Sequence, residues 1–592
     1  MQIKRRQPNE QTYTLALAAG LSPLLAHIIA CRLPDLTGDI QRIVSPGLRY
    51  IDHPDLLKDG AKAAKRIAAA IIRRERIGIL TDYDVDGVTS HALIYRALTE
   101  YFGFPKDNIH SLIGHRIQDG YGVSERLTQR ILANAILPEL IITADCGSSD
   151  EARIACLQKA GIDVIVTDHH ALPLAGPPPS AYAVVNPTRS DCRYPDTTIA
   201  GCMTAWLLMS QVRSQLIEQG YLSSAAPKLA RELDYVGLGT VADCVSIGTA
   251  INRAVVAIGL GYLNRFTRPC WRAIRTLLNR GQQPLTVEDL SFQLGPRINA
   301  RSRLADPYAA LKYLLADNDQ DAMDYLTLLN ADNQERKGIE RDMVETAKLE
   351  AGRQVEQGCA TLVVYLNDGH AGVQGIVASR LVEAFGRPAI VFCNTTEPGQ
   401  LTGSARSIAE LHMRDALQQV ADTHTDVFVK FGGHRGAAGL TVYHARLPDF
   451  REAFEQAVRG QLGDITLGPA IWTDGNLSAE AISLATVVEL EQLQPFGREF
   501  EAPVFEGTFT VETVRVVGAE AVHLALTLST PAKLYSAIWF RALPAPSAPL
   551  PVATGNTVHC AYRLSCDEFR GVQRLRLVLA YARQVLEPET VI

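Results

Sequence analysis

The chain of 592 residues is 47% hydrophobic and 21% charged, with a formal net charge of −6, and its length predicts roughly three or four domains. Its apolar runs are shorter than the roughly 20 residues that cross a bilayer, and no apolar stretch follows the basic N-terminus, which argues against a membrane protein and a signal peptide. The 11 cysteines form no Cys-x-x-Cys pair, which argues against a zinc ribbon or a disulfide framework and favours a cytoplasmic location.

The first 300 residues predict a helical segment followed by an α/β domain. Residues 1–50 are rich in Leu and Ala and indicate a helical lead-in. Over 51–300, short β-branched runs alternate with helical stretches, a rhythm typical of βαβ units and a mostly parallel sheet. The expected strands lie near 77–80, 109–113, 140–144, 163–167 and 182–185, and residues 200–280 are expected to be helical.

Three further regions are predicted after residue 300. Residues 301–357 are polar enough to form a helical connector. Residues 358–460 indicate a second α/β unit, with strands expected at 361–365 and 388–392, a helix at 374–385 and a glycine-dense segment at 431–439. Over 465–585 five short alternating strands favour a small β-barrel, for which the OB-fold is the leading candidate.

Acidic and histidine residues follow three of the strands predicted in the first α/β domain. Carboxyl ends of parallel strands converge on one crevice, and carboxylates gathered there repel one another unless a cation lies between them. Oxygen and imidazole ligands without thiolate favour Mn²⁺ or Mg²⁺, and two such ions promote phosphoester hydrolysis. The residues are Asp82, Asp84 and Asp86 after the first strand, Asp145 after 140–144, and Asp168, His169 and His170 after 163–167, with Asp243 within or just after a later helix.

Each of these motifs has an ordinary structural explanation when it stands alone. An Asp-x-Asp pair after a strand is common, and a His-His pair is more often a surface feature than a set of ligands. Alternate residues of an extended segment face the same way, so Asp82, Asp84 and Asp86 are expected to point together, with Gly87 allowing a tight turn into a helix that begins near Val88. The coincidence of three clusters in one βαβ array is what predicts a joint site.

In this order and spacing, the motifs resemble those of the DHH phosphoesterase superfamily. They are Asp-Tyr-Asp-x-Asp-Gly at 82–87, Asp-x-Gly at 145–147, Asp-His-His at 168–170 and Gly-Thr-Val-Ala-Asp at 239–243. Segments 294–300, 372–381, 431–434 and 493–497 are similar to parts of its RecJ family of single-strand-specific exonucleases. The resemblance covers about residues 50–580 and implies a DHH parallel-sheet domain, a helical connector, a second α/β DHH-associated domain and a C-terminal OB-fold barrel.

The resemblance implies an exonuclease that degrades single-stranded DNA from 5′ to 3′ into 5′-mononucleotides, in DNA recombination and repair, with two Mn²⁺ or Mg²⁺ ions. It also implies a single-strand-binding protein and a RecQ-type helicase as partners, and an enclosed channel that fits a monomer. The implied metal ligands are Asp82, Asp84, Asp86, Asp145, His169 and Asp243. Beside Asp145 and His169, the implied catalytic group includes His170 near the scissile phosphate and Asp168 orienting a histidine.

DNA contacts are expected from several domains. Arg116 follows a strand on the metal edge of the sheet, where a guanidinium can hold a phosphate bidentately. The alternative for each arginine is a surface ion pair, and for Gly432-Gly433 it is a plain tight turn. The expected contacts are Arg116, Arg297, Asn299, Arg303, Ser379, Arg380, Gly432, Gly433 and His434. The chain departs from the RecJ pattern at Arg301-Ser302 and at Glu499-Phe500, which leaves the local DNA path open.

Two other functions fit part of the pattern. A DHH diesterase for short oligoribonucleotides or cyclic dinucleotides would share the two α/β units but generally lacks a barrel. A scaffold protein that had kept the fold without cleaving would be expected to have lost metal ligands. The long connector, the C-terminal barrel and the complete ligand set all favour the exonuclease.

Overall fold

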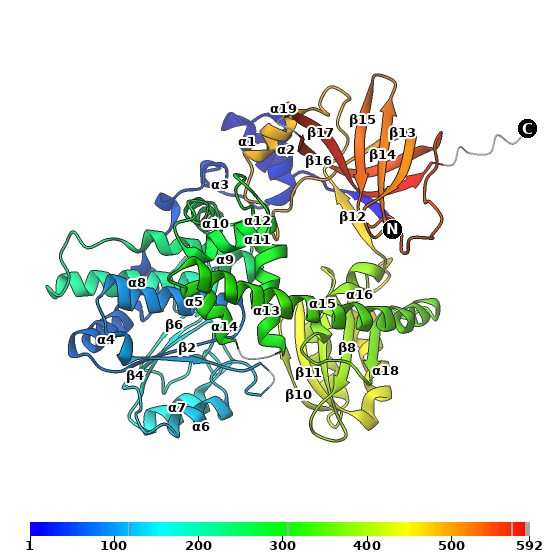
Figure 1. Cartoon of the computed structure of the whole chain (residues 1–592). Coiled ribbons are helices and arrows are strands. Elements are labelled where there is room, and N and C mark those ends of the chain that lie inside the picture. The colour runs from blue at the N-terminus through cyan, green and yellow to red at the C-terminus, as the bar shows by residue number, and fades with distance from the viewer. Residues whose placement is uncertain (117, 305–306, 570–571, 586–592) are drawn as a thin grey trace, which may run out of the picture.

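A computed structural model describes residues 1–116, 118–304, 307–569 and 572–585. Figure 1 shows a helix-covered sheet and a second sheet linked by one long helix, with a barrel packed above them. None of the described helices combines the length and the apolar surface that crossing a bilayer requires.

The first sheet is parallel throughout, in the order β3-β2-β4-β5-β6. Alternate side chains face opposite layers: Ile141 packs into the core beneath the sheet, whereas Ile142 packs into the main core above it. Both faces are therefore buried, which explains why these strands are nearly continuous apolar runs. The strands are β2 (Ile77–Thr81), β3 (Ile109–Ile113), β4 (Leu140–Ala144), β5 (Asp163–Thr167) and β6 (Ala183–Val185), as predicted.

Helices cover both faces of this sheet (Figure 1). On one face lie α6 (Glu125–Leu132) and α7 (Glu151–Lys159). On the other lie α4 (Gly60–Arg73), α5 (Val85–Arg96), α8 (Gly201–Glu218) and α9 (Leu233–Ala242). The chain continues through α10 (Ala250–Leu263), α11 (Pro269–Leu277), α12 (Val287–Asp289), α13 (Gly295–Leu304) and α14 (Tyr308–Leu315) to the 38-residue connector α15 (Asp319–Glu356).

The second sheet is mixed, in the order β10-β11-β9-β8-β7, with only β7 and β8 parallel. Its strands are β7 (Leu362–Leu366), β8 (Ala389–Asn394), β9 (Gln400–Arg406), β10 (Phe428–Gly433) and β11 (Ala437–Tyr443). Its helices are α16 (Gln374–Phe385), α17 (Met413–Thr423) and α18 (Leu447–Leu462). The glycine-dense segment at 431–439 forms the hairpin between β10 and β11.

The C-terminal region forms the predicted five-stranded barrel, closed in the order β13-β14-β15-β17-β16. It is preceded by β12 (Ala470–Thr473) and α19 (Leu484–Glu491). Its strands are β13 (Phe505–Val517), β14 (His523–Thr530), β15 (Lys533–Trp539), β16 (Thr557–Phe569) and β17 (Val572–Gln584). Closure removes the exposed sheet edges that would otherwise pair with other chains.

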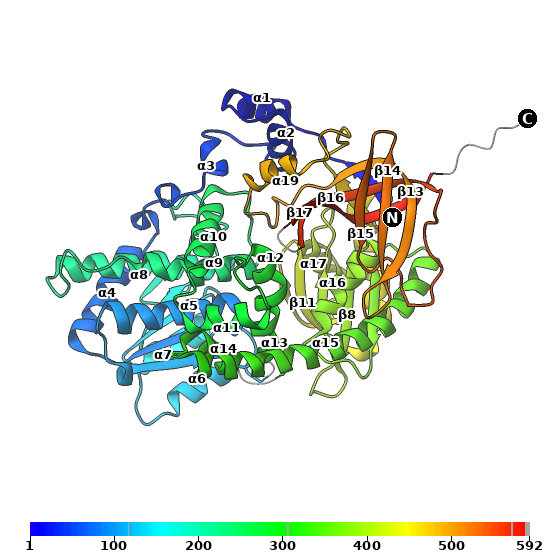
Figure 2. The ribbon, with the colours of Figure 1, turned by 45° about the horizontal axis from the view of Figure 1, so that its top comes forward.

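The N-terminal lead-in is helical at α1 (Glu10–Ala18), α2 (Pro23–Arg32) and α3 (Gln41–Val44), as predicted, but its first residues are not. Strand β1 (Gln2–Arg5) pairs in parallel with β12, a partner far away in the sequence. Two bonds between Arg32 and Asp474, of 2.5 and 2.9 Å and both buried, fix α2 to the same region. In Figures 1 and 2, α2 lies beside α19, so the lead-in is bound to the barrel side of the molecule.

Candidate metal centre

The three strand-end clusters meet at one edge of the first sheet, because β2, β4 and β5 are neighbours and all end there. His169 lies at the centre of the cluster. Its Nε2 atom is 3.1 Å from Asp145 Oδ1, 3.6 Å from Asp243 Oδ2 and 3.9 Å from Asp86 Oδ2. Asp243 reaches this point from the C-cap of α9, at the helix end where the sequence placed it.

The first motif is not an extended segment, so that expectation was wrong. Asp82 follows β2, Asp84 is the N-cap of α5, and Asp86 lies in the first turn of that helix. The strand-to-helix turn, rather than strand alternation, therefore brings the carboxylates together. Gly87 is needed for close approach, because a Cβ atom there would collide with the carbonyl of Asp82.

Two backbone features hold the carboxylates in place. Both Asp86 oxygens accept hydrogen bonds from the first turn of α8, Oδ2 from Gly201 N at 2.7 Å and Oδ1 from Cys202 N at 2.9 Å. Asp145 has a φ of 61°, a left-handed conformation that costs an L residue roughly 1 kcal/mol. Such strain is characteristic of functional sites.

The carboxylates destabilise one another in the absence of a cation. Burial raises the pKa of Asp82 to about 8, and the charge of Asp84 adds to the rise. Burial, followed by the charges of Asp86 and Asp84, raises the pKa of Asp145 and of Asp243 well above the usual value. The arrangement therefore favours anything that supplies compensating positive charge.

The donor set fits divalent metal ions. Asp82 Oδ1, Asp145 Oδ1 and His169 Nε2 are buried atoms that make no hydrogen bond within the described residues. Burial also lowers the pKa of His169, which keeps its imidazole neutral as a ligand must be. Two groups of residues each bring their potential ligand atoms within 4.8 Å of one another. Asp82, Asp84 and Asp145 form one group, and Asp86, His169 and Asp243 form another.

Beside these groups, His170 is held by Asp168. Its Nδ1 lies 2.8 Å from Asp168 Oδ1, and the same oxygen accepts from the backbone N–H of His169 at 2.7 Å. Burial opposes the charged imidazolium, but the hydrogen bond to Asp168 outweighs it and raises the pKa of His170 to about 9. His170 is half-exposed and its ligand atom also falls within 4.8 Å of those of Asp145 and His169.

An arginine cluster lies on the Asp82 side of the centre. The Arg116 guanidinium stacks 4.2 Å from the Tyr83 ring centroid, and its Nε atom is buried without a hydrogen bond among the described residues. Burial, and then the charges of Arg116, Arg336 and Arg406, lower the pKa of Arg303 to about 9. Arginines crowd together in this way where an anion is to be held.

Arg406 was not among the residues expected from the sequence. It ends β9, and its Nη1 donates to Ser404 Oγ at 3.1 Å. A Cβ atom at Gly375 would lie 2.9 Å from both Arg406 Nη2 and Ser404 Oγ, so the glycine of α16 makes room for the pair. The available signal was weak: a strand of small residues that ends in Ser-Ala-Arg-Ser.

Other expected DNA contacts have structural partners. Arg297 donates to Asn330 Oδ1 at 3.0 Å and Gln293 O at 2.6 Å, and Asn299 Oδ1 accepts from Val85 N at 3.1 Å. Asn299 therefore supports the turn of the first motif, and neither residue points freely at the cluster.

Ser379 and Arg380 lie outside the arginine cluster. Ser379 Oγ donates to the backbone of its own helix. Arg380 pairs with Glu340 and Glu383 and is half-exposed. Glu340 also pairs with Arg336, so the Glu340 carboxylate lies between Arg380 and Arg336.

The glycine-dense hairpin brings His434 to the metal side of the second unit. Burial lowers the pKa of His434, and the charges of Arg498, Arg406 and His170 lower it further. Gly433 has a φ of 150° and closely approaches Ala437 O, so a side chain there would collide with the neighbouring strand. Gly432 and Gly433 form the last two pairs of the β10–β11 ladder.

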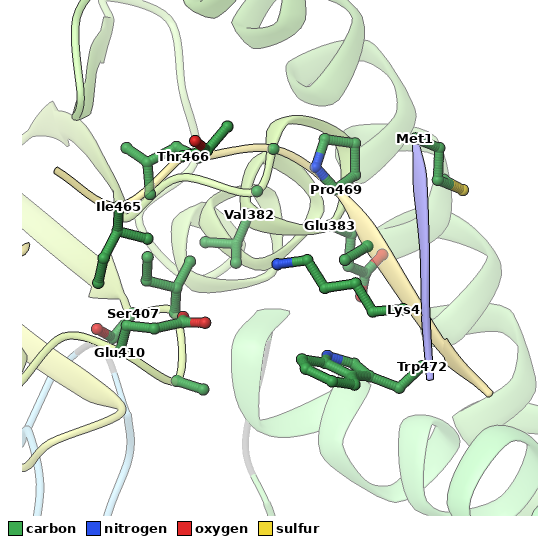
Figure 3. A pocket seen from close by; sticks show the side chains of 16 residues that line it. Met1, Lys4, Val382, Glu383, Ser407, Glu410, Ile465, Thr466, Pro469 and Trp472 are labelled. Atoms are coloured by element: carbon green, nitrogen blue, oxygen red, sulfur yellow. The ribbon is translucent and has the colours of Figure 1, made fainter. Parts of the chain in front are cut away.

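A separate pocket of about 370 Å³ lies where β1 and β12 meet the second unit (Figure 3). Lys4 extends into it, with Nζ 5.6 Å from the Trp472 ring centroid, and Glu383 and Glu410 line its walls. None of the clustered carboxylates or histidines lines this pocket.

Comparison with known proteins identifies three domains: the DHH family, N-terminal domain, over 76–240, the DHHA1 domain over 359–460, and the RecJ OB domain over 473–581. The single-stranded-DNA-specific exonuclease RecJ of Dickeya dadantii is 35% identical over 586 residues, covering 98% of both chains. That of Escherichia coli is 35% identical over 589 residues, again covering 98% of both. The crystal structure of RecJ from Thermus thermophilus in complex with Mn²⁺ has a TM-score of 0.77 and 25% identity, covering 99% of this chain and 79% of that one.

Proposed function

The chain belongs to the RecJ family of single-stranded-DNA-specific exonucleases, and from this premise we propose that it removes 5′-mononucleotides from single-stranded DNA in the 5′→3′ direction, with Mn²⁺ or Mg²⁺. The observation that carries the proposal is the convergence around His169 of buried carboxylate and imidazole atoms that make no hydrogen bond among the described residues. A candidate metal centre with an arginine cluster beside it, in a chain that also carries a C-terminal barrel, suits a polyanionic single strand as substrate.

We propose two cation positions. Asp82, Asp84 and Asp145 would hold one ion, and Asp86, His169 and Asp243 the other, in keeping with two of the three groups of potential ligand atoms. When bound, such ions supply charge neutralisation and an activated water for phosphodiester hydrolysis. The protein's own contribution is to fix the ligands, through the α5 N-terminus for Asp84 and the α8 N-terminus for Asp86.

His170 is proposed to donate a hydrogen bond to the scissile phosphate. Asp168 orients the ring and keeps the imidazole protonated near neutral pH, since the pKa of His170 is raised to about 9. Asp168 is itself fixed by Ser148 N, which donates to its Oδ2 at 2.9 Å. This is the arrangement by which a buried carboxylate positions a histidine.

The arginine cluster is proposed to bind the 5′-terminal phosphate. Arg116 comes from the first sheet, Arg303 from α13 and Arg406 from the second sheet, so the site exists only where the two α/β units meet. Burial strengthens each charge-assisted hydrogen bond to a phosphate. A strand end held here would place the first internucleotide bond over the metal ligands.

The remaining expectations follow from family membership alone. We propose a cytoplasmic monomer that acts in recombination and repair with a single-strand-binding protein and a RecQ-type helicase. Co-purification of each candidate partner with the full chain, compared with a barrel-deleted chain, tests these contacts directly.

The activity is tested with one oligonucleotide labelled at either end, and with its blunt duplex. We expect immediate release of labelled mononucleotide from the 5′ end in Mn²⁺, none in EDTA, and none from the duplex. Cleavage of dinucleotides without attack on long strands would instead identify a small-substrate diesterase. No cleavage of any substrate would identify a scaffold protein.

A further inference from the structure

The loop that leads into the barrel, residues 493–500, packs directly beside the metal centre. Ile247 N donates to Arg498 O at 2.9 Å, and Arg498 Nη1 donates to Cys244 O at 3.2 Å. Cys244 immediately follows Asp243, the candidate metal ligand at the end of α9. The loop therefore places the Arg498 guanidinium against the residue that follows Asp243 in the sequence.

This placement is fixed by packing rather than by the Arg498 side chain. Arg253, which is fully buried, donates to Leu493 O at 2.6 Å and Pro495 O at 3.1 Å, and its guanidinium lies 4.2 Å from the Phe500 ring centroid. A Cβ atom at Gly497 would lie 2.5 Å from Ile247 Cγ1. The loop backbone is thus held on the catalytic domain before Arg498 contributes anything.

The Arg498 guanidinium itself is available. Its side chain is 58% exposed, and its ion pair with the equally exposed Glu499 is long, at 3.7 Å. Among the described residues its hydrogen bonding is limited to Cys244 O. An exposed ion pair of this kind contributes little, so a phosphate could displace Glu499 at small cost.

The charge of Arg498 acts on groups of both α/β units. Its charge opposes the burial that raises the pKa of Asp243 on the first unit, and it adds to the burial that lowers the pKa of His434 on the second. At the opposite side of the cluster, Arg116 acts on Asp82 in the same way. The metal centre therefore has an arginine on each side. Arg116 is on the Asp82 side, and Arg498, from the loop that leads into the barrel, is on the Asp243 side.

We propose that Arg498 binds a backbone phosphate on the 3′ side of the cleaved bond, where the single strand passes from the barrel to the metal centre. The inference rests on the proposed function, because it assumes a strand whose 5′ phosphate lies at Arg116, Arg303 and Arg406. Arg498 would thus be a positioning residue on the loop that leads into the barrel. The part of the chain that holds the single strand would also align it for cleavage.

The test measures kcat/KM for a 5′-phosphorylated single strand in Mn²⁺ at several salt concentrations. The proteins are the full wild-type chain, Arg498→Ala, Arg498→Lys and the control Arg341→Ala, whose side chain is 77% exposed on α15. We expect Arg498→Ala to lose about tenfold, mainly through KM, and to reduce the slope against log salt by about 0.7, the value for one phosphate contact on a single strand. Arg498→Lys should keep the wild-type slope, and Arg341→Ala should match wild type.

Substrates with one neutral methylphosphonate linkage at successive positions locate the contact. The wild-type enzyme should lose activity at a linkage on the 3′ side of the first bond, and Arg498→Ala should show no further loss there. An unchanged salt slope in Arg498→Ala, or equal sensitivity of both proteins at every linkage, would overturn the proposal. Thermal melting separates loss of contact from loss of fold, since a merely structural role would lower Tm in Arg498→Lys as well and leave the slopes alone. A wild-type chain that fails to cut from the 5′ end would instead count against the proposed function.

Discussion

The two sides of the metal centre offer arginine to the substrate in different ways. On the Asp82 side, Arg303 and Arg406 are largely buried and crowd against Arg116. On the Asp243 side, Arg498 is 58% exposed and carried on a loop. A buried cluster suits the terminal phosphate, which is bound at the strand end and leaves with the mononucleotide, whereas an exposed guanidinium is screened by salt and suits a backbone phosphate of the strand that follows.

The largest expected effect comes from the centre that both sides share. Asp145→Ala removes a ligand atom common to two of the three potential metal groups. We expect cleavage to fall at least about a thousandfold, because the ions supply several kcal/mol of stabilisation, while single-strand binding is largely kept. Cleavage assays and fluorescence anisotropy on the same preparation check this. Loss of both properties would mean that the metals are required for binding.

The buried side should discriminate the chemistry of the strand end. We expect Arg406→Ala to lose about tenfold to a hundredfold in kcat/KM on a 5′-phosphorylated strand, because one charge-assisted hydrogen bond contributes about 1.5–3 kcal/mol. A 5′-hydroxyl strand should be affected much less. The matched control is Arg380→Ala, which removes an arginine already paired with Glu340 and Glu383. A larger loss in Arg380→Ala would return the phosphate site to the residues expected from the sequence.

Salt sharpens the contrast between the two sides. Exposed charges more than about 8 Å apart are largely screened at physiological ionic strength, and buried pairs are screened much less. Each variant loses one phosphate contact, so both defects should shrink as salt rises, and that of Arg498→Ala should shrink more because its guanidinium is exposed. Parallel salt titrations of kcat/KM measure this, and identical salt dependence for both variants would contradict the distinction.

Removing a carboxylate should stabilise the metal-free protein. Burial and the charges of Asp86 and Asp84 raise the pKa of Asp243, so its ionised form is unfavourable in the folded state. We expect Asp243→Asn to raise Tm in EDTA by about 2 °C, equivalent to roughly 1 kcal/mol, and to weaken the increase in Tm that Mn²⁺ causes in wild type. A lower Tm in EDTA would show that the carboxylate has a structural role instead.

The smallest expected effect concerns the departure at Glu499. This residue has a φ of 63°, a left-handed conformation that favours glycine over a residue with a side chain. Glu499→Gly should stabilise the protein by at most about 1 kcal/mol, which corresponds to a rise in Tm of about 1 to 2 °C. It should also free Arg498 and slightly lower KM at low salt. The control is Glu501→Gly, directly after the loop, which relieves no positive φ and loses the Glu501 ion pair with Arg6, so it should not raise Tm.

Local sequence determined most of the fold and indicated the candidate metal ligands. Each strand of the first sheet is a short β-branched run, so its position could be predicted from residues 77–185 alone, and a parallel sheet necessarily brings adjacent strand ends together. The RecJ family and its fold class are confirmed by domain matches and by relatives 35% identical over nearly the full chain. The candidate metal ligands could be picked out from the sequence because they lie within a few residues of strand or helix ends.

Only the tertiary structure decided which cations face the centre. Arg116, Arg303 and Arg406 are spread over about 290 residues and share no motif; Arg116 and Arg303 were expected from the sequence, whereas Arg406 was not. The pairing of β1 with β12 and the contact of Arg498 with Cys244 also join segments that are far apart in the sequence, so local pattern could not predict them. Local pattern fixes what a segment becomes, because propensity and burial act over a few residues. Which segments meet is set by packing between domains, and the proposed phosphate contacts lie where the domains meet.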